Sequence, residues 1–197
     1  MTDINETELE AFILEHRIEV ERDAAEKQAA YRKPRLCAPS IPDGCMGFIT
    51  TASLFAADKY SRVKHFDGFT TVFEGLRQKY NLGPVNARIA ERVNMTEDYF
   101  NRLFSRNGIS ERGALWALAM GLKLSIEDAE KLFESCGQSL RGSYYIKKPG
   151  KEEEYNSQVD REGFLLYFLE RPNEYDDIDD INAELSKRGM KLLGNCT

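Results

Sequence analysis

The sequence predicts an all-α protein, and three observations support this fold class. Apolar residues recur at steps of three and four along most of the chain, which is the spacing of one face of a helix. Residues that cap or end helices, among them Thr96, Ser125 and Gly137, stand at the boundaries of these periodic segments. The one stretch that resembles a strand, at Tyr144 and Tyr145, is short and isolated.

Length and charge narrow the class of protein. A chain of 197 residues can bury a core, and its net charge of −6 argues against a generally basic surface that coats nucleic acid, though not against one local basic face. The first twenty residues are acidic and hold no continuous apolar run, unlike a signal peptide. The longest apolar stretch, Ala114–Leu118, is too short to span a bilayer. We therefore expect a soluble, cytoplasmic protein.

The cysteines and histidines give little support for a metal centre. A zinc site built from Cys37, Cys45 and His65 would have an eight-residue step between its cysteines and no fourth ligand. Free thiols in a reducing compartment explain the four cysteines better, because none belongs to a Cys-x-x-Cys pair. We expect neither a metal nor a cofactor. The remaining cysteines and histidine are Cys136, Cys196 and His16.

The first 66 residues should form a helical extension followed by a loop rich in proline and glycine. Residues 5–33 carry a helical stripe, for which two interpretations remain open. We favour a helix that packs against the rest of the protein over a dimerisation helix, because its heptads are few and irregular. Residues 34–47 should form the loop, and a short helix is expected at Ser53–Val63. The stripe consists of Leu9, Phe12, Ile13, His16, Val20, Ala24 and Tyr31.

Segment 69–137 has the strongest periodicity and should form one compact domain of five helices. The first helix begins at Phe69, and the second should run over 84–93, with Pro84 in its first turn and Val85 facing inward. The other residues expected to face inward in these two helices are Val72, Phe73, Leu76, Tyr80, Ile89, Ala90 and Val93.

The stretch 89–104 has the form of a helix-turn-helix, a unit that places its second helix in a DNA major groove. In the turn, Asn94 stands where the chain needs a residue that tolerates a left-handed conformation, and Met95 should insert into the core. Thr96 should cap the third helix by accepting a hydrogen bond from the N–H of residue 98 or 99. The inward residues of this helix are Phe100, Leu103 and Phe104.

Two more helices complete the central segment. The fourth is expected over 111–120, with Ser110 as its cap and Gly121 as its stop. Ser125 and Asp128 predict a capping box at the start of the fifth helix. The inward residues of the fifth helix are Leu132, Phe133 and Cys136.

The last sixty residues differ in composition from the central segment. Residues 138–157 should form a linker, and residues 158–197 a helical hairpin. Its helices are expected over 160–170 and 176–188, the second ended by Gly189. The residues expected to fold back onto this pair are Met190, Leu192 and Leu193.

Segment 69–137, about a third of the chain, resembles the xenobiotic-response-element (XRE)/Cro-repressor family of helix-turn-helix domains. Five matching elements in the right order make the resemblance more specific than any one element alone. It implies a five-helix, lambda-repressor-like domain that binds double-stranded DNA and regulates transcription. The segments 179–185 and 192–194 resemble the tail behind this domain in some bacterial regulators. The matching elements are Ile89-Ala90, Asn94-Met95-Thr96, the trio Phe100, Leu103 and Phe104, the stretch Ala114–Leu122, and the stretch Ser125–Leu132.

In this family the N-terminal residues of the third helix touch base edges. The resemblance therefore implies that Arg102 and Arg106 contact guanine or phosphate and that Asn101 pairs with adenine. It also implies that Arg88 and Arg92 on the second helix hold phosphates. The other candidate contacts are Thr96, Glu97, Asp98, Tyr99 and Ser105.

The charge of this segment keeps a second function open. Residues 69–137 contain nine basic and nine acidic side chains, so their net charge is zero, and Glu97 and Asp98 begin the third helix. Such a module should bind DNA weakly as a monomer, and we expect a homodimer on a palindromic operator. The alternative is a protein–protein adaptor built on the same scaffold, which should tolerate mutation of Arg102 and Arg106. An enzyme is the least expected class, because the chain has no glycine-rich phosphate loop and no nucleophile motif.

Trp116 lies off the stripe formed by Leu115, Leu118 and Leu122. We expect its side chain to pack against the N-terminal region or the C-terminal helices. The alternative is that it forms part of a surface for a partner protein.

Overall fold

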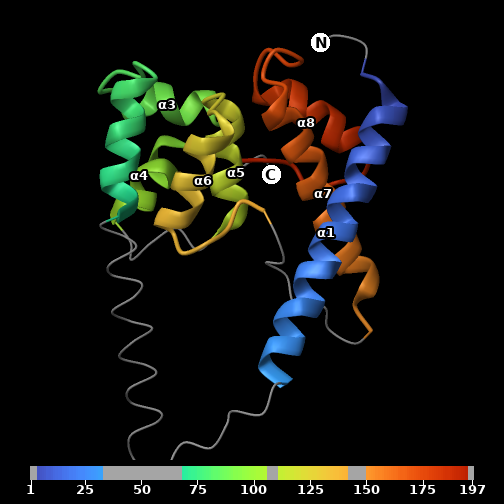
Figure 1. Cartoon of the computed structure of the whole chain (residues 1–197). Coiled ribbons are helices and arrows are strands. Elements are labelled where there is room, and N and C mark those ends of the chain that lie inside the picture. The colour runs from blue at the N-terminus through green and yellow to red at the C-terminus, as the bar shows by residue number, and fades with distance from the viewer. Residues whose placement is uncertain (1–3, 33–67, 106–110, 142–149, 195–197) are drawn as a thin grey trace, which may run out of the picture.

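The computed structural model describes residues 4–32, 68–105, 111–141 and 150–194, and every regular element in these ranges is a helix (Figure 1). The predicted all-α class is therefore confirmed. None of the helices in these ranges combines the length and the apolar composition that a bilayer crossing requires. The helices are α1 (Glu6–Arg32), a helix over 68–79, α3 (Asn86–Arg92), α4 (Glu97–Ser105), α5 (Arg112–Gly121), α6 (Ile126–Ser135), α7 (Glu152–Glu170) and α8 (Ile178–Lys187).

Several expectations lie outside the described residues. They are the loop over 34–47, the helix at Ser53–Val63, the short strand at Tyr144 and Tyr145, the proposed cap Ser110, and the side chains of Cys37, Cys45, His65, Arg106 and Cys196.

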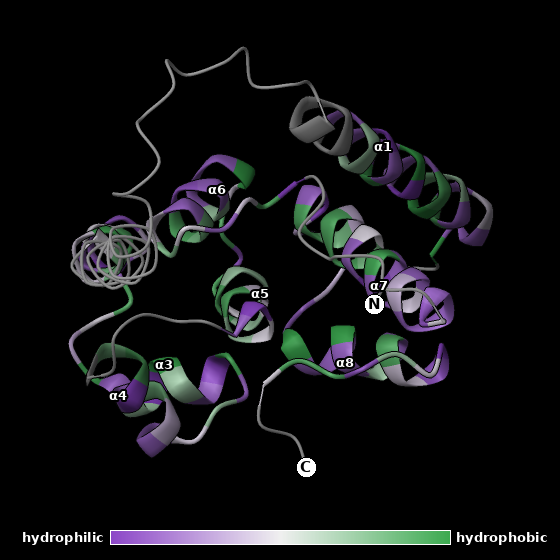
Figure 2. Cartoon of the chain, turned by 90° about the horizontal axis from the view of Figure 1, so that it is seen from below, coloured by the Kyte–Doolittle hydropathy of each residue, from purple (hydrophilic) through white to green (hydrophobic). Residues whose placement is uncertain are grey.

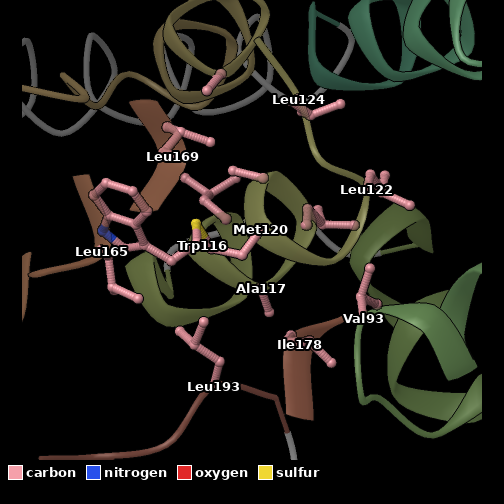
Figure 3. Close-up of a cluster of buried hydrophobic side chains, with 14 of the residues drawn as sticks. Val93, Trp116, Ala117, Met120, Leu122, Leu124, Leu165, Leu169, Ile178 and Leu193 are labelled. Carbon is pink, nitrogen blue, oxygen red and sulfur yellow. The ribbon is translucent and has the colours of Figure 1, made fainter. Parts of the chain in front are cut away.

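α5 is the central helix, with α3, α4 and α6 on one side and α7 and α8 on the other (Figure 2). Its residues 114–120 are all buried, as expected for a helix that is apolar on every side. Trp116 is fully buried, and its ring meets that of Phe133 at a centroid distance of 5.2 Å. Leu165 and Leu169 of α7 lie beside it (Figure 3). Trp116 therefore packs against the C-terminal helices, and its alternative role in a partner surface is wrong.

α1 lies along α7 (Figure 1). Arg17 of α1 forms an ion pair with Asp160 of α7 at 2.5 Å. The favoured interpretation of the N-terminal stripe, a helix packed against the rest of the protein, is thus confirmed. The outer face of α1 exposes Leu14 and Ile18. Over residues 6–26 of α1, the buried residues are Leu9, Ile13, His16 and Val20.

Two helices of the central segment begin later than predicted. α3 begins at Asn86, so Pro84 precedes the helix, and Val85 at the N-cap is 48% exposed rather than inward. The backbone of Val85 is extended, with φ −86° and ψ +108°. α5 begins at Arg112, with Glu111 in the N-cap position. In both helices the N-cap side chain makes no capping hydrogen bond.

Gly121 does not stop α5 but is its last residue. A Cβ atom at this position would lie 2.5 Å from the carbonyl oxygen of Arg92 and 2.9 Å from Cα of Val93. The absence of a side chain therefore lets α5 pack closely against the end of α3. The residue with the left-handed backbone after α5 is Lys123, with φ +51°.

The cap of α6 is confirmed only in part. The hydroxyl oxygen of Ser125 accepts a hydrogen bond from the N–H of Asp128 at 3.3 Å. The N–H of Ser125, however, donates to the hydroxyl of Tyr80 at 2.8 Å rather than to the Asp128 carboxylate. That carboxylate instead accepts from Tyr80 and from Lys79, because the helix over 68–79 ends beside α6. Gly137 ends this region with φ +70°.

The C-terminal helices also differ from the predicted bounds. α7 begins at Glu152, inside the expected linker 138–157. The acidic residues 152–154 occupy its first turn, where the helix dipole favours negative charge. α8 begins at Ile178 because Asp177 takes the N-cap position, and its Oδ1 accepts hydrogen bonds from the N–H groups of Asp179 and Asp180.

Candidate nucleic-acid interface

Three residues determine the turn between α3 and α4. Asn94 has φ +54°, a left-handed conformation that asparagine tolerates. Met95 is buried beneath the turn. The hydroxyl oxygen of Thr96 accepts a hydrogen bond from the N–H of Tyr99 at 3.2 Å. All three predictions are confirmed, and together they set the residue at which α4 begins.

The inner face of α4 is anchored by aromatic packing. Phe100 is fully buried and Phe104 half-buried. Their rings contact those of Phe69 and Phe73 on the helix over 68–79, with centroid distances of 5.2–5.9 Å. Leu103 is buried on the same face. Because this face is held in the core, the opposite face of α4 is held toward solvent.

That opposite face carries Glu97, Asp98, Asn101 and Arg102, all exposed. Nε of Arg102 donates to the backbone oxygen of Asp98 at 3.3 Å, within the same helix. Its guanidinium carbon lies 5.8 Å from the centroid of the Tyr99 ring. The structure thus brings four of the predicted contact residues together on one surface.

Asn101 is oriented by a chain of polar residues from two neighbouring helices. Its Oδ1 accepts a hydrogen bond from Nδ2 of Asn86 at 2.8 Å. Oδ1 of Asn86 in turn accepts from Nη2 of Arg77 at 2.6 Å. Sequence reasoning missed Asn86 and Arg77, because neither belongs to a motif and both act only through a neighbour. They position the Asn101 amide relative to α3.

Arg88 and Arg92 lie one turn apart on α3, and both are exposed. Neither forms an ion pair with another residue in the described ranges. Ser105 is the last residue of α4, and its side chain, like the whole of Arg106, lies outside what the structure describes.

Tyr99 is directed differently from the other candidates. It is half-buried, and its hydroxyl donates to Oε2 of Glu111 at the start of α5, at 2.5 Å. Burial, together with this hydrogen bond to a carboxylate, raises the pKa of the Tyr99 phenol. Tyr99 therefore links α4 to α5, a role that the sequence pattern did not indicate.

The exposed charges of α3 and α4 balance one another. Arg88, Arg92 and Arg102 are positive, whereas Glu91 is negative and so are the two acids at the start of α4. One copy of this surface therefore attracts phosphate only weakly, although its side chains offer several hydrogen-bond donors to base edges.

No group of three or more His, Cys, Asp or Glu side chains in the described ranges is arranged to hold a metal ion. Cys136 is half-buried and forms no disulfide, and its Sγ lies 3.8 Å from the hydroxyl oxygen of Ser135. Comparison of the chain with family models, curated proteins and solved structures gives no match, so inferences about function depend on the residues described above.

Proposed function

We propose that this protein is a sequence-specific DNA-binding regulator of transcription, in which α3 and α4 act as a lambda-repressor-like helix-turn-helix. The observation that carries the proposal is the presentation of α4. Its apolar face is anchored among phenylalanine rings, Thr96 caps its start, and its polar face is exposed beside the arginines of α3. A helix held in this way can enter a major groove without rearrangement of the core.

Each exposed residue then has a chemical role. Arg102 donates to guanine or to a phosphate, and Asn101 hydrogen-bonds a base edge. Arg88 and Arg92 hold phosphates beside the groove. Glu97 and Asp98 stabilise the first turn through the helix dipole and can accept from the amino group of cytosine.

Two copies acting on a palindromic site would compensate for the balanced charge of one copy. A homodimer doubles the arginine contacts and requires half-sites that follow its two-fold symmetry. We therefore propose a dimer on DNA as the functional form.

The proposal is tested by titrating the full chain against DNA fragments from the region upstream of its own coding sequence, with fluorescence anisotropy as the readout. We expect a sequence-dependent complex at micromolar protein that weakens as salt increases. Arg102→Ala should weaken specific binding by about 5- to 150-fold. Arg22→Ala, which removes an exposed arginine of α1, is the matched control and should leave binding unchanged. Absence of any salt-sensitive, sequence-dependent complex would contradict the proposal.

A protein–protein adaptor is the second candidate, and the outer face of α1 favours it. Leu14 and Ile18 lie one turn apart there and are 55% and 57% exposed. For an adaptor, Leu14→Ser should abolish capture of a partner protein while Arg102→Ala has no effect. For the DNA-binding regulator, Arg102→Ala should weaken operator binding, and Leu14→Ser should leave it unchanged.

A further inference from the structure

A pocket of about 350 Å³ opens beside the first turn of α4, where α4, α5, α7 and the C-terminal segment meet. We propose that this pocket binds a small zwitterion, an amino acid with an apolar side chain. The volume lies within the range of about 300–1,000 Å³ that is typical of small-molecule sites. Its size therefore suits one compact ligand.

The charged groups of the lining determine the ends of the ligand. Glu111 and Glu154 contribute carboxylates, and Arg161 and Lys191 contribute cations. Lys191 is exposed and forms no ion pair with another residue of the described ranges. Carboxylates favour an ammonium group, and cations favour a carboxylate, through charge-assisted hydrogen bonds. A ligand with one group of each sign complements Glu111 and Lys191, because Glu154 already pairs with Lys151 and Arg161 already donates to backbone oxygens.

The uncharged part of the lining is mixed, because Ser157 and Gln158 are polar, and an apolar ligand side chain fits only its apolar residues. Met95 and Ala114 are buried, and Leu192 is half-buried and packs against the core. A polar side chain placed against these residues would lose hydrogen bonds to water without replacement.

The C-terminal wall of the pocket is held in place before any ligand binds. Arg161 donates to the backbone oxygen of Lys191 at 2.5 Å and to that of Leu192 at 3.2 Å. The N–H of Leu193 donates to Oδ1 of Asn182 at 2.7 Å. Gly194 has φ +79°, and a Cβ atom there would lie 2.1 Å from the oxygen of Asn94. This fixed wall lowers the ordering cost of binding.

Tyr99 connects the pocket to α4. Its hydroxyl donates to Glu111, so an ammonium group that pairs with Glu111 also immobilises Tyr99 and the first turn of α4. Any effect of the ligand on DNA recognition rests on the proposed function. The binding of the ligand itself does not depend on that function, because it is measured without DNA.

The test uses isothermal titration calorimetry of the full chain with each of the twenty standard amino acids. We expect saturable binding of at least one apolar amino acid. N-acetylation or amidation of that amino acid should weaken binding at least about tenfold, and so should Glu111→Gln or Lys191→Ala. The matched controls Glu134→Gln and Lys131→Ala, both on the exposed face of α6, should leave affinity unchanged. Hydrogen exchange at residues 95–100 should slow when the ligand is bound.

Four results would overturn the proposal. They are the absence of binding at millimolar amino acid, binding that survives both pocket variants, equal binding of the end-blocked derivatives, and a preference for putrescine or succinate, which carry charges of one sign only. If the full chain binds the amino acid but does not bind DNA, that result contradicts the proposed function and leaves the proposed ligand site intact.

Discussion

α4 and α7 use their polar residues in different ways. On α4 these residues contact their own helix or adjoining helices, as Arg102 contacts the backbone of Asp98 and Asn101 contacts Asn86. On α7 they join elements far apart in the sequence, as Asp160 joins Arg17 of α1. The exposed polar face of α4 is thus linked to helices that lie close to it in the sequence.

The same contrast separates the central helices from the outer group of α1, α7 and α8. Arg188 after α8 pairs with Glu6 and Glu10 of α1, and Arg171 after α7 pairs with Glu8. In the outer group, therefore, ion pairs fasten one helix to another. The comparison teaches that the charges of the outer group link helices far apart in the sequence, whereas the charges of α4 face solvent.

The largest expected effect tests the ion pair that joins the two groups. Arg112 and Glu162 are buried and hydrogen-bonded to each other, and Arg112 also donates to the backbone oxygens of Ser139 and Leu140. Arg112→Met leaves Glu162 as an uncompensated buried charge, so we expect a loss of about 3–5 kcal/mol in the free energy of unfolding by urea. Arg17→Met, which breaks a partly exposed pair, should cost only about 0–1 kcal/mol. Equal losses in the two variants would show that burial does not determine the cost of breaking these ion pairs.

A smaller effect is expected at the contact between α5 and α3. Gly121→Ala places a methyl group against the backbone of Arg92, and we expect a loss of about 1–3 kcal/mol. Gly75→Ala is the matched control, because a Cβ atom there meets nothing within 4 Å. That variant should gain about 0.5–1 kcal/mol from helix propensity. Urea unfolding of both variants checks the sign of each change.

The cap of α4 tests the local stability of the proposed recognition helix. Thr96→Ala removes the acceptor of the Tyr99 N–H, with an expected loss of about 1 kcal/mol in urea unfolding. Thr96→Ser retains the hydroxyl and should remain within about 0.5 kcal/mol of the wild type. A Thr96→Ala variant as stable as the wild type would show that the cap does not stabilise α4.

The smallest expected effect concerns pH and the interface of α1 with α7. Burial lowers the pKa of His16 from its ordinary value of 6.5, and Arg112 and Arg141 act in the same direction. Glu162 and Glu19 partly oppose them. The unfolded chain therefore binds a proton more readily than the folded chain. Stability should be fully present above pH 6.5 and fall as pH decreases below this value.

The check for His16 is the free energy of unfolding measured between about pH 7.5 and 5.5, a window chosen above the range in which carboxylates titrate. The wild type should lose more stability across this window than His16→Gln, which has no imidazole. If the free energy of unfolding changes equally with pH in the two proteins, His16 is equally protonated in the folded and the unfolded chain.

The sequence by itself determined the elements whose causes lie within a few residues. The apolar spacing of α4 and α6, the Thr96 and Ser125 caps, and the left-handed Asn94 all depend on contacts with near neighbours. The polar face that makes α4 a candidate interface could be predicted for the same reason.

Only the tertiary structure decided which polar groups are buried and what they contact. Arg112 forms an ion pair with Glu162, 50 residues away in the sequence. The Tyr80 hydroxyl accepts a hydrogen bond from the N–H of Ser125, 45 residues away. Gly121, which the sequence indicates as a helix stop, is required by the approach of another helix. The pocket beside Tyr99 likewise draws its walls from distant segments. No local pattern encodes such contacts, because their energies depend on burial and on partners that the fold alone brings together.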